Sequence, residues 1–290
     1  MKRFLFWAVI KVAFCTCIFA QAPNAAPGNN PQYTEALRQN KMTASAQAAI
    51  QSSMATPVCS YNFSFGSGDS ALNYCVTVNG NITSIETPEA HQNVAVEQAE
   101  GYGLCDQTTG VSYSDFAGFG DSGNWGPPSL ISQTATAVKI ARTTTDGVWT
   151  LTQVITQVTG TLPHIRIAMT LKNNTAVPRN ALLLRYLDAD VDQVVLNSTD
   201  ANRMGAAEWN SIDMVSPDQA VGLMLQTVGD HLFAHQALVQ TVYYPPDPCN
   251  AFAHRSTAEL IYTDASMVMT FQPLVGAHSS VTANMMYQGW

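Results

Sequence analysis

Residues 138–158 read VKIARTTTDGVWTLTQVITQV, which is two apolar runs on either side of the pair Asp146-Gly147. An Asp-Gly pair between apolar runs is the strongest short-range hairpin signal, because glycine readily adopts the positive φ that such turns need. The first run, 138–142, and the second, 148–158, are therefore expected to be adjacent antiparallel strands.

The next residues, 159–192, read TGTLPHIRIAMTLKNNTAVPRNALLLRYLDADVD and continue the pattern. In the run 164–172 apolar and polar residues alternate, which is the period of a half-buried antiparallel strand. The run 181–187 is too apolar for a sheet edge and predicts a central strand. Residues 138–187 thus predict four successive strands, arranged as a meander.

The chain from residue 58 onward follows the same style. The segments 59–65 and 72–78 alternate around a Gly-rich turn and predict a hairpin, and Asn79-Gly80 is a further turn signal. No amphipathic helix of useful length follows residue 57. We therefore expect an all-β protein, with residues 58–290 forming a single large antiparallel two-sheet β-sandwich.

The first 57 residues have a different character. Residues 1–20 combine a basic start with an apolar run and are followed by small residues, which is typical of a cleaved secretory signal peptide. A transmembrane anchor is the competing interpretation, but the run is short and contains Lys11. Residues 21–57 predict a low-complexity linker that could hold a short helix. The expected location is secreted or periplasmic.

Charge narrows the range of partners. The whole chain carries a formal charge of −8, and removal of residues 1–20 leaves 10 basic and 21 acidic residues, or −11. Nucleic acid and anionic membrane surfaces are bound through clusters of Lys and Arg, and the sequence has none. The expected partner is therefore neither nucleic acid nor a membrane, but a neutral or cationic one, such as a glycan or another extracellular ligand.

Four cysteines remain after residue 20, and in a secreted chain they are expected to form disulfides. A Cys59–Cys75 link looks natural across the first hairpin. However, the register that puts the aromatic residues of both strands on one face places these cysteines on opposite faces. We therefore expect Cys75 to pair with Cys105, and Cys59 with Cys249.

The aspartates Asp188, Asp190 and Asp192 alternate after the fourth apolar run. If the strand continues through them, their carboxylates share one face, and Ca²⁺ collects oxygen ligands at such a density. The helix-loop-helix calcium motif does not fit. A solvated acidic strand end is the competing interpretation, so the only cofactor expected is a structural calcium ion.

Residues Tyr113, Asp115 and Trp125 surround a Gly-rich loop. A rigid aromatic side chain beside a carboxylate is what a sugar-stacking site uses, so these three residues are the candidate ligand-binding site. The competing interpretation is that Trp125 plugs the end of its own sandwich.

Several segments resemble a group of secreted bacterial β-sandwich-like proteins of unknown function. They begin at Asn79 (Asn-Gly-Asn-Ile-Thr), Glu100 (Glu-Gly-Tyr-Gly-Leu-Cys-Asp), Arg142 (Arg-Thr-Thr-Thr-Asp-Gly) and Arg185 (Arg-Tyr-Leu-Asp-Ala-Asp). The resemblance spans residues 58–290. It implies a secreted bacterial β protein and transfers no functional residue.

No catalytic pattern stands out. The sequence lacks a Gly-x-Ser-x-Gly elbow, and His231 and His235 lack the glutamate of a zinc-protease motif. The leading hypothesis is a secreted, non-catalytic β-sandwich that binds an extracellular ligand such as a glycan. The alternative is a carbohydrate-active hydrolase or lyase that uses Asp188, Asp190 and Glu208, whose carboxylates would have to face each other across a cleft.

Overall fold

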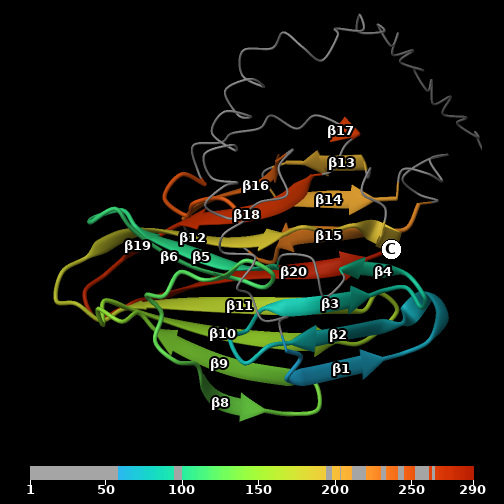
Figure 1. Ribbon diagram of the computed structural model, residues 1–290, viewed down its shortest axis with the longest axis horizontal. Helices are drawn as coiled ribbons and strands as arrows, with labels where there is room; N and C mark the ends of the chain where they lie inside the picture. Colours follow the sequence, from blue (N-terminus) through green and yellow to red (C-terminus); the bar gives the residue numbers. More distant parts are fainter. Residues whose placement is uncertain are drawn as a thin grey trace, which may run out of the picture. The chain divides into compact units, whose positions relative to one another are not determined.

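The computed structural model describes residues 58–94, 100–193, 198–202, 204–210, 220–229, 233–240, 245–251, 261–262 and 265–290 (Figure 1). These residues form strands and two short 3₁₀ helices, η1 and η2. The elements are β1 (Tyr61–Phe65), η1 (Gly68–Ser70), β2 (Leu72–Val76), β3 (Ile82–Glu86), β4 (Gln92–Val94), β5 (Glu100–Asp106), β6 (Val111–Phe116), β7 (Gly120–Asp121), β8 (Ser129–Gln133), β9 (Ala137–Thr143), β10 (Trp149–Val158), β11 (His164–Asn173), β12 (Arg179–Leu187), η2 (Val191–Gln193), β13 (Ser198–Ala201), β14 (Gly205–Trp209), β15 (Gly222–Thr227), β16 (Ala234–Gln240), β17 (Ile261–Tyr262), β18 (Ser266–Gln272), β19 (Leu274–Val275) and β20 (Ser280–Gly289).

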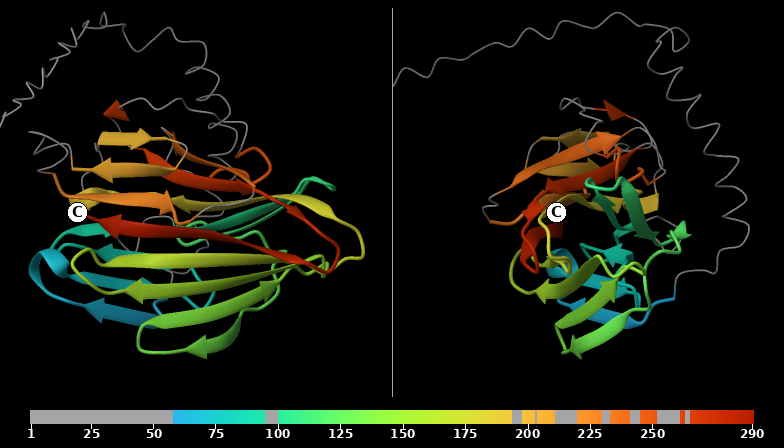
Figure 2. Two further views of the ribbon diagram at one scale, coloured as in Figure 1. Left: turned by 180° about the vertical axis from the view of Figure 1, so that it is seen from behind. Right: turned by 90° about the vertical axis from the view of Figure 1, so that its left-hand side faces the viewer.

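The strands form three antiparallel sheets. The largest has nine strands in the order β17-β13-β14-β15-β20-β11-β10-β9-β8, and Figures 1 and 2 show these strands following one another. A seven-stranded sheet has the order β16-β18-β12-β5-β6-β7, with β19 paired to β12, and the remaining sheet is β1-β2-β3-β4. The expected all-β antiparallel class is confirmed.

Strand β10 shows how the layers face each other. The side chain of Gln153 on β10 receives a hydrogen bond from Arg185 of β12, in the seven-stranded sheet. The side-chain amide of Gln157, farther along β10, donates to the backbone carbonyl of Leu72 in β2, which belongs to the four-stranded sheet. The nine-stranded sheet is therefore one layer of a sandwich, and the opposite layer is divided into two sheets rather than built from one.

The predicted strands of the central segment are all present, but they do not form one meander. Strands β9, β10 and β11 pair consecutively, and β12 crosses to the other layer, where it lies between β5 and β18. The buried amide of Asn173 organises this crossover by donating to the carbonyls of Val177, Val275 and Gly276. The prediction that all four strands pair in sequence order was wrong. The turn residues Asn173, Asn174 and Pro178 show that the chain turns, but they do not reveal which sheet the next strand joins.

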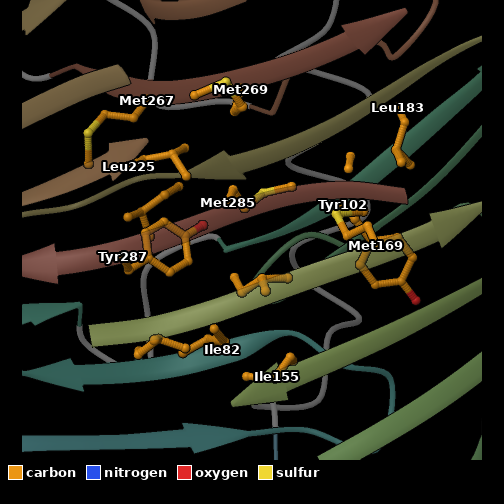
Figure 3. Packing of buried hydrophobic residues seen from close by; sticks show 14 of the residues in the cluster. Ile82, Tyr102, Ile155, Met169, Leu183, Leu225, Met267, Met269, Met285 and Tyr287 are labelled. Atoms are coloured by element: carbon orange, nitrogen blue, oxygen red, sulfur yellow. The ribbon is translucent and has the colours of Figure 1, made fainter. Parts of the chain in front are cut away.

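The inward faces of the three sheets share one hydrophobic cluster. Strand β10 buries every second residue, as the alternating sequence predicts. Figure 3 shows the packing of Met169, Met267, Met269 and Met285, all of which are fully buried. Flexible methionine side chains fill irregular space between sheets, and burial of each large apolar side chain stabilises the fold by about 1.5–3 kcal/mol.

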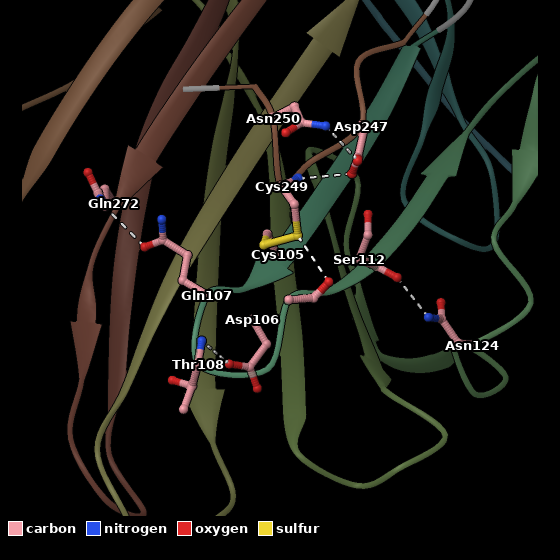
Figure 4. Close-up of a disulfide and its surroundings, with 11 residues drawn as sticks. Cys105, Asp106, Gln107, Thr108, Ser112, Asn124, Asp247, Cys249, Asn250 and Gln272 are labelled. Atoms are coloured by element: carbon pink, nitrogen blue, oxygen red, sulfur yellow. Dashed lines mark hydrogen bonds between the residues drawn. A yellow bond between two sulfur atoms is a disulfide. The ribbon is translucent and has the colours of Figure 1, made fainter. Parts of the chain in front are cut away.

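The disulfides correct the predicted pairing. Cys59 is linked to Cys75, and Cys105 to Cys249 (Figure 4). In the β1–β2 ladder Cys75 stands opposite Asn62, so the cysteines' faces differ as expected. However, Cys59 precedes β1, where the ladder no longer fixes the direction of its side chain. Phe63 pairs with Tyr74, where the aromatic pattern had suggested Leu72 as its partner, so the register differs by two residues.

The strands belong to a compact unit that runs from Gln47 to Trp290. The predicted signal peptide, residues 1–20, and the predicted linker, 21–57, lie outside the described residues. Within the part of the chain that is described, no helix has the length and hydropathy of a membrane span.

Candidate functional site

A fully buried ion pair of the seven-stranded sheet is hydrogen-bonded to side chains of the nine-stranded sheet. Arg185, in the middle of β12, donates from Nε to the carboxylate of Glu100, the first residue of β5. A second guanidinium nitrogen donates to Oε1 of Gln153 at 2.6 Å, and the hydroxyl of Tyr287 on β20 donates to Glu100 at 3.0 Å. Glu100 and Arg185 each have 0% of their surface exposed. An isolated charge would be very costly here, so these groups depend on one another.

A second charged group lies beside the first. Arg142 on β9 donates to the carboxylates of Asp115 on β6 and Asp121 on β7, and to the hydroxyl of Tyr102 at 3.3 Å. Its guanidinium carbon lies 5.6 Å from the ring centre of Trp125. The arginine is therefore held by two carboxylates, a phenol and an aromatic face at once.

We name Glu100, Tyr102, Asp115, Arg142, Gln153, Arg185 and Tyr287 the polar cluster. Its members come from both layers: β9, β10 and β20 of the nine-stranded sheet, and β5, β6 and β12 of the seven-stranded sheet. Two of its members, Tyr102 and Tyr287, are labelled in Figure 3, where they lie among buried hydrophobic side chains. A sandwich core needs no charges to be stable, so a cluster of this kind is a candidate functional site.

The turn formed by residues 77–81, between β2 and β3, closes the polar cluster. The carbonyl of Asn79 accepts hydrogen bonds from Tyr102 at 3.0 Å and from Gln153 at 3.2 Å. The carbonyl of Gly80 accepts one from Arg185 at 3.1 Å, and the amide of Ile82 donates to Glu100 at 2.5 Å. The backbone of one turn therefore connects both charged groups.

Burial dominates the electrostatics of the polar cluster. Complete burial raises the pKa of the Glu100 carboxyl, although the charge of Arg185 offsets part of the rise. Burial also raises the pKa of Asp115 to about 6, again against the pull of Arg142. The pKa of the Tyr287 hydroxyl is raised by burial and by the nearby Glu100 carboxylate. Low solvent access is thus the main influence on every one of these groups.

The structure brings the predicted ligand-binding residues together but buries them. The rings of Tyr113 and Trp125 have centres 5.8 Å apart, and Asp115 holds the Arg142 that lies over Trp125. Trp125 is only 5% exposed and Tyr113 only 1%. Trp125 therefore fits the competing interpretation, that of a plug at the end of the sandwich, and offers little surface for sugar stacking.

The predicted calcium ligands follow the end of a strand instead of lying in it. Strand β12 ends at Leu187, so the alternation on which the prediction depended stops before Asp188. Asp188 is buried and Asp190 half-buried, whereas Asp192 has a positive φ of 57° and binds Nδ1 of His91 at 3.0 Å. Among the described residues no group of three His, Cys, Asp or Glu side chains could hold a metal ion.

The carboxylates of the alternative enzyme hypothesis are largely buried. Glu208 on β14 is 1% exposed, Asp188 is 9% exposed and Asp190 is half-buried. Of the two histidines considered for zinc, His235 lies on β16 and His231 lies outside the described residues.

Sequence reasoning missed Glu100, Arg142, Gln153 and Arg185. A signal existed for Arg185, because it is the one charged residue within the apolar run 181–187. An arginine in a central strand must find a buried anion, yet the sequence does not say which of the 21 acidic residues supplies it.

Comparisons with known proteins add only distant likenesses. No family model matches the sequence, and no curated protein matches it. Among solved structures, a galactose mutarotase-like protein from Lactobacillus casei is 9% identical, with 79% of this chain and 100% of that chain covered and a TM-score of 0.45. A galactose mutarotase related enzyme from Lactobacillus acidophilus is 5% identical, with 79% and 97% covered and a TM-score of 0.37. Likeness at this level carries no conclusion about this chain.

Proposed function

We propose that this protein is a secreted, non-catalytic binding protein for a neutral polyhydroxylated ligand such as a glycan, and that the polar cluster is its binding site. The observation that carries the proposal is the concentration of guanidinium, carboxylate, amide and phenol groups between two apolar sheet faces. Ligand sites combine such a small set of convergent polar groups with apolar walls.

The chemistry of the polar cluster favours a neutral ligand. Two arginines are balanced by Glu100, Asp115 and the neighbouring Asp121, and the chain as a whole carries a charge of −8. A phosphate or sulfate group would need an excess of positive charge. Sugar hydroxyls both donate and accept hydrogen bonds, and they match donors and acceptors that lie side by side.

The hydrogen bonds of the cluster favour binding over catalysis. A general acid or base must exchange a proton with the substrate. The Glu100 carboxylate already accepts from Arg185, Tyr287 and the amide of Ile82. Because its oxygens are engaged by the protein, Glu100 supports the site and is not available as a proton donor.

One observation favours an enzyme that would use Asp115 in place of the carboxylates considered from the sequence. The pKa of Asp115, about 6, lies in the range that suits acid–base chemistry near neutral pH. A hydrolase or lyase that uses Asp115 is therefore the second candidate function.

A glycan array and a polysaccharide-degradation screen on the oxidised protein test both candidates. The first variant is Tyr102→Phe, which removes a hydroxyl bonded to Arg142 and to the 77–81 turn. The matched control is Tyr113→Phe, whose hydroxyl binds Asp146 instead. We expect glycan binding without degradation, weakened roughly tenfold in Tyr102→Phe and unchanged in Tyr113→Phe.

Three results would contradict the proposal. Absence of binding to every glycan would remove the function. Weaker binding in the Tyr113→Phe control alone would move the site to the predicted group of Tyr113, Asp115 and Trp125. Release of sugar products that stops in Asp115→Asn would establish the enzyme alternative.

A further inference from the structure

We infer that the 77–81 turn is a built-in substitute for the ligand, which occupies the polar cluster and is displaced when the ligand binds. The inference rests on the proposed function and adds a gate to it. Its basis is that the turn fills the cluster with backbone groups, although the two sheets it lies between are joined through their own side chains.

The turn presents the same chemistry that a sugar would. Two adjacent carbonyls, of Asn79 and Gly80, accept three hydrogen bonds from Tyr102, Gln153 and Arg185. Neighbouring hydroxyls on a sugar ring can accept hydrogen bonds from the same three donors. The ligand therefore replaces the turn bond for bond, and the exchange leaves no buried polar group without a partner.

The turn is shaped for this close approach. Gly80 has a φ of +89°, and a Cβ atom on it would lie 2.4 Å from Nε2 of Gln153. A Cβ atom at this position therefore forces the turn and the end of the Gln153 side chain apart. Val78, two residues earlier, is 49% exposed. The turn therefore reaches from the protein surface to the buried arginine, and its outer side marks the entrance.

The free-energy cost of exposing buried residues limits how much of the chain can move. Release of the whole β1–β4 sheet would expose Leu72, Val76, Ile82 and Ile85, which are all buried. The loss of that buried apolar surface is comparable to the stability of an entire domain. Displacement of Asn79 and Gly80 breaks only their carbonyl hydrogen bonds to the cluster, which the ligand restores. Asn81 stays in place, because its buried side-chain amide donates to the carbonyls of Glu100 and Asp115. The moving part is therefore the turn, and the strands of this sheet stay in place.

Gly80→Ala tests the inference because it drives the turn away from Gln153. Gly147→Ala is the matched control, since Gly147 also has a positive φ, 74°, but nothing lies within 4 Å of the added Cβ atom. If the turn no longer occupies the cluster, a larger fraction of the molecules can bind the glycan, and the apparent affinity rises in proportion to that fraction. We expect Gly80→Ala to bind the best glycan of the array at least about tenfold more tightly than wild type. Gly147→Ala should match wild type.

Hydrogen exchange on wild-type protein provides the second measurement and needs no variant to fold. With that glycan bound, the Gly80 amide should exchange faster, because its hydrogen bond to the carbonyl of Thr77 within the turn is lost. The amides of β10 and β11 should exchange at the same rate or more slowly.

The outcomes separate the two proposals. If no glycan binds wild type or Gly80→Ala, the proposed function fails. If wild type binds a glycan, but its Gly80 amide exchanges at an unchanged rate and Gly80→Ala has wild-type affinity, only the gating turn is overturned. If Gly80→Ala does not fold, the exchange result on wild type decides alone. Binding by Gly80→Ala where wild type binds nothing supports both proposals.

Discussion

Arg185 and Glu100 form the most buried charge pair among the described residues, and each has the other as its main counter-charge. Arg185→Met leaves the Glu100 carboxylate without that charge. We expect the free energy of unfolding to fall by about 3–5 kcal/mol, because an uncompensated buried charge is far more costly than a missing pair.

The double variant Glu100→Gln with Arg185→Met is the control for this prediction. It should recover part of the loss when both are measured by urea denaturation. A single variant that loses less than about 1 kcal/mol would mean that the pair contributes no net charge interaction.

The raised pKa of Asp115, about 6, predicts a pH-dependent stability. A carboxyl whose pKa is higher in the folded state contributes stability at low pH, below its unfolded pKa of about 4, and that contribution is lost as the pH rises through the folded pKa. Asp115→Asn should therefore show a flatter profile of unfolding free energy between about pH 4 and pH 6. Parallel profiles for the two proteins would show that Arg142 keeps the carboxylate ionised throughout.

At the scale of residues, the sequence identified neighbours but not their environment. Tyr113, Asp115 and Trp125 do lie together, because the turns near them are short. Their burial depends on Arg142, which lies on another strand, and a single sequence carries no record of that contact. The same reason hid the pair of Glu100 and Arg185, which are 85 positions apart.

At the scale of elements, the two disulfides constrain very different loops. Cys59 and Cys75 are 16 residues apart, and Cys105 and Cys249 are 144 apart. Loop-closure entropy predicts losses of about 3 and about 5 kcal/mol when each pair is replaced by serine. Urea denaturation of the two double variants should show the larger loss for Cys105 and Cys249. The reverse order would mean that local packing outweighs chain entropy.

The alternation within strands was predicted well, but the contacts of residues just outside the strands were not. The alternation in β10 and β11 specifies strands because polar and apolar residues must lie on opposite faces. The direction of Cys59 could not be inferred, because its position precedes the ladder that would fix it. The same holds for Asp188, Asp190 and Asp192, which follow the end of β12.

At the scale of the whole molecule, the calcium hypothesis has a direct test. Asp192 is engaged by His91, and the carboxylates around it do not share a strand face. We therefore expect equal melting temperatures in EDTA and in millimolar Ca²⁺. A higher melting temperature in Ca²⁺ would show that the folded state binds the ion, because such binding stabilises by mass action.

The all-β class follows from the sequence because alternation and turn signals are local. The division of one layer into two sheets does not, since it depends on pairings between distant strands. The crossing of β12 is the clearest case: its residues were assigned correctly, and its sheet was not.

The central place of β20 in the nine-stranded sheet has a consequence for synthesis. This strand pairs with β11 on one side and β15 on the other, and it follows every other strand of the sheet in the sequence. A ribosome adds about 5–20 residues per second, so β8 to β11 emerge well before the strand that joins them to β15. The nine-stranded sheet is therefore incomplete until β20, which ends at Gly289, has been synthesised. For the secreted protein proposed above, this late completion would suit an export machinery that accepts only unfolded chains.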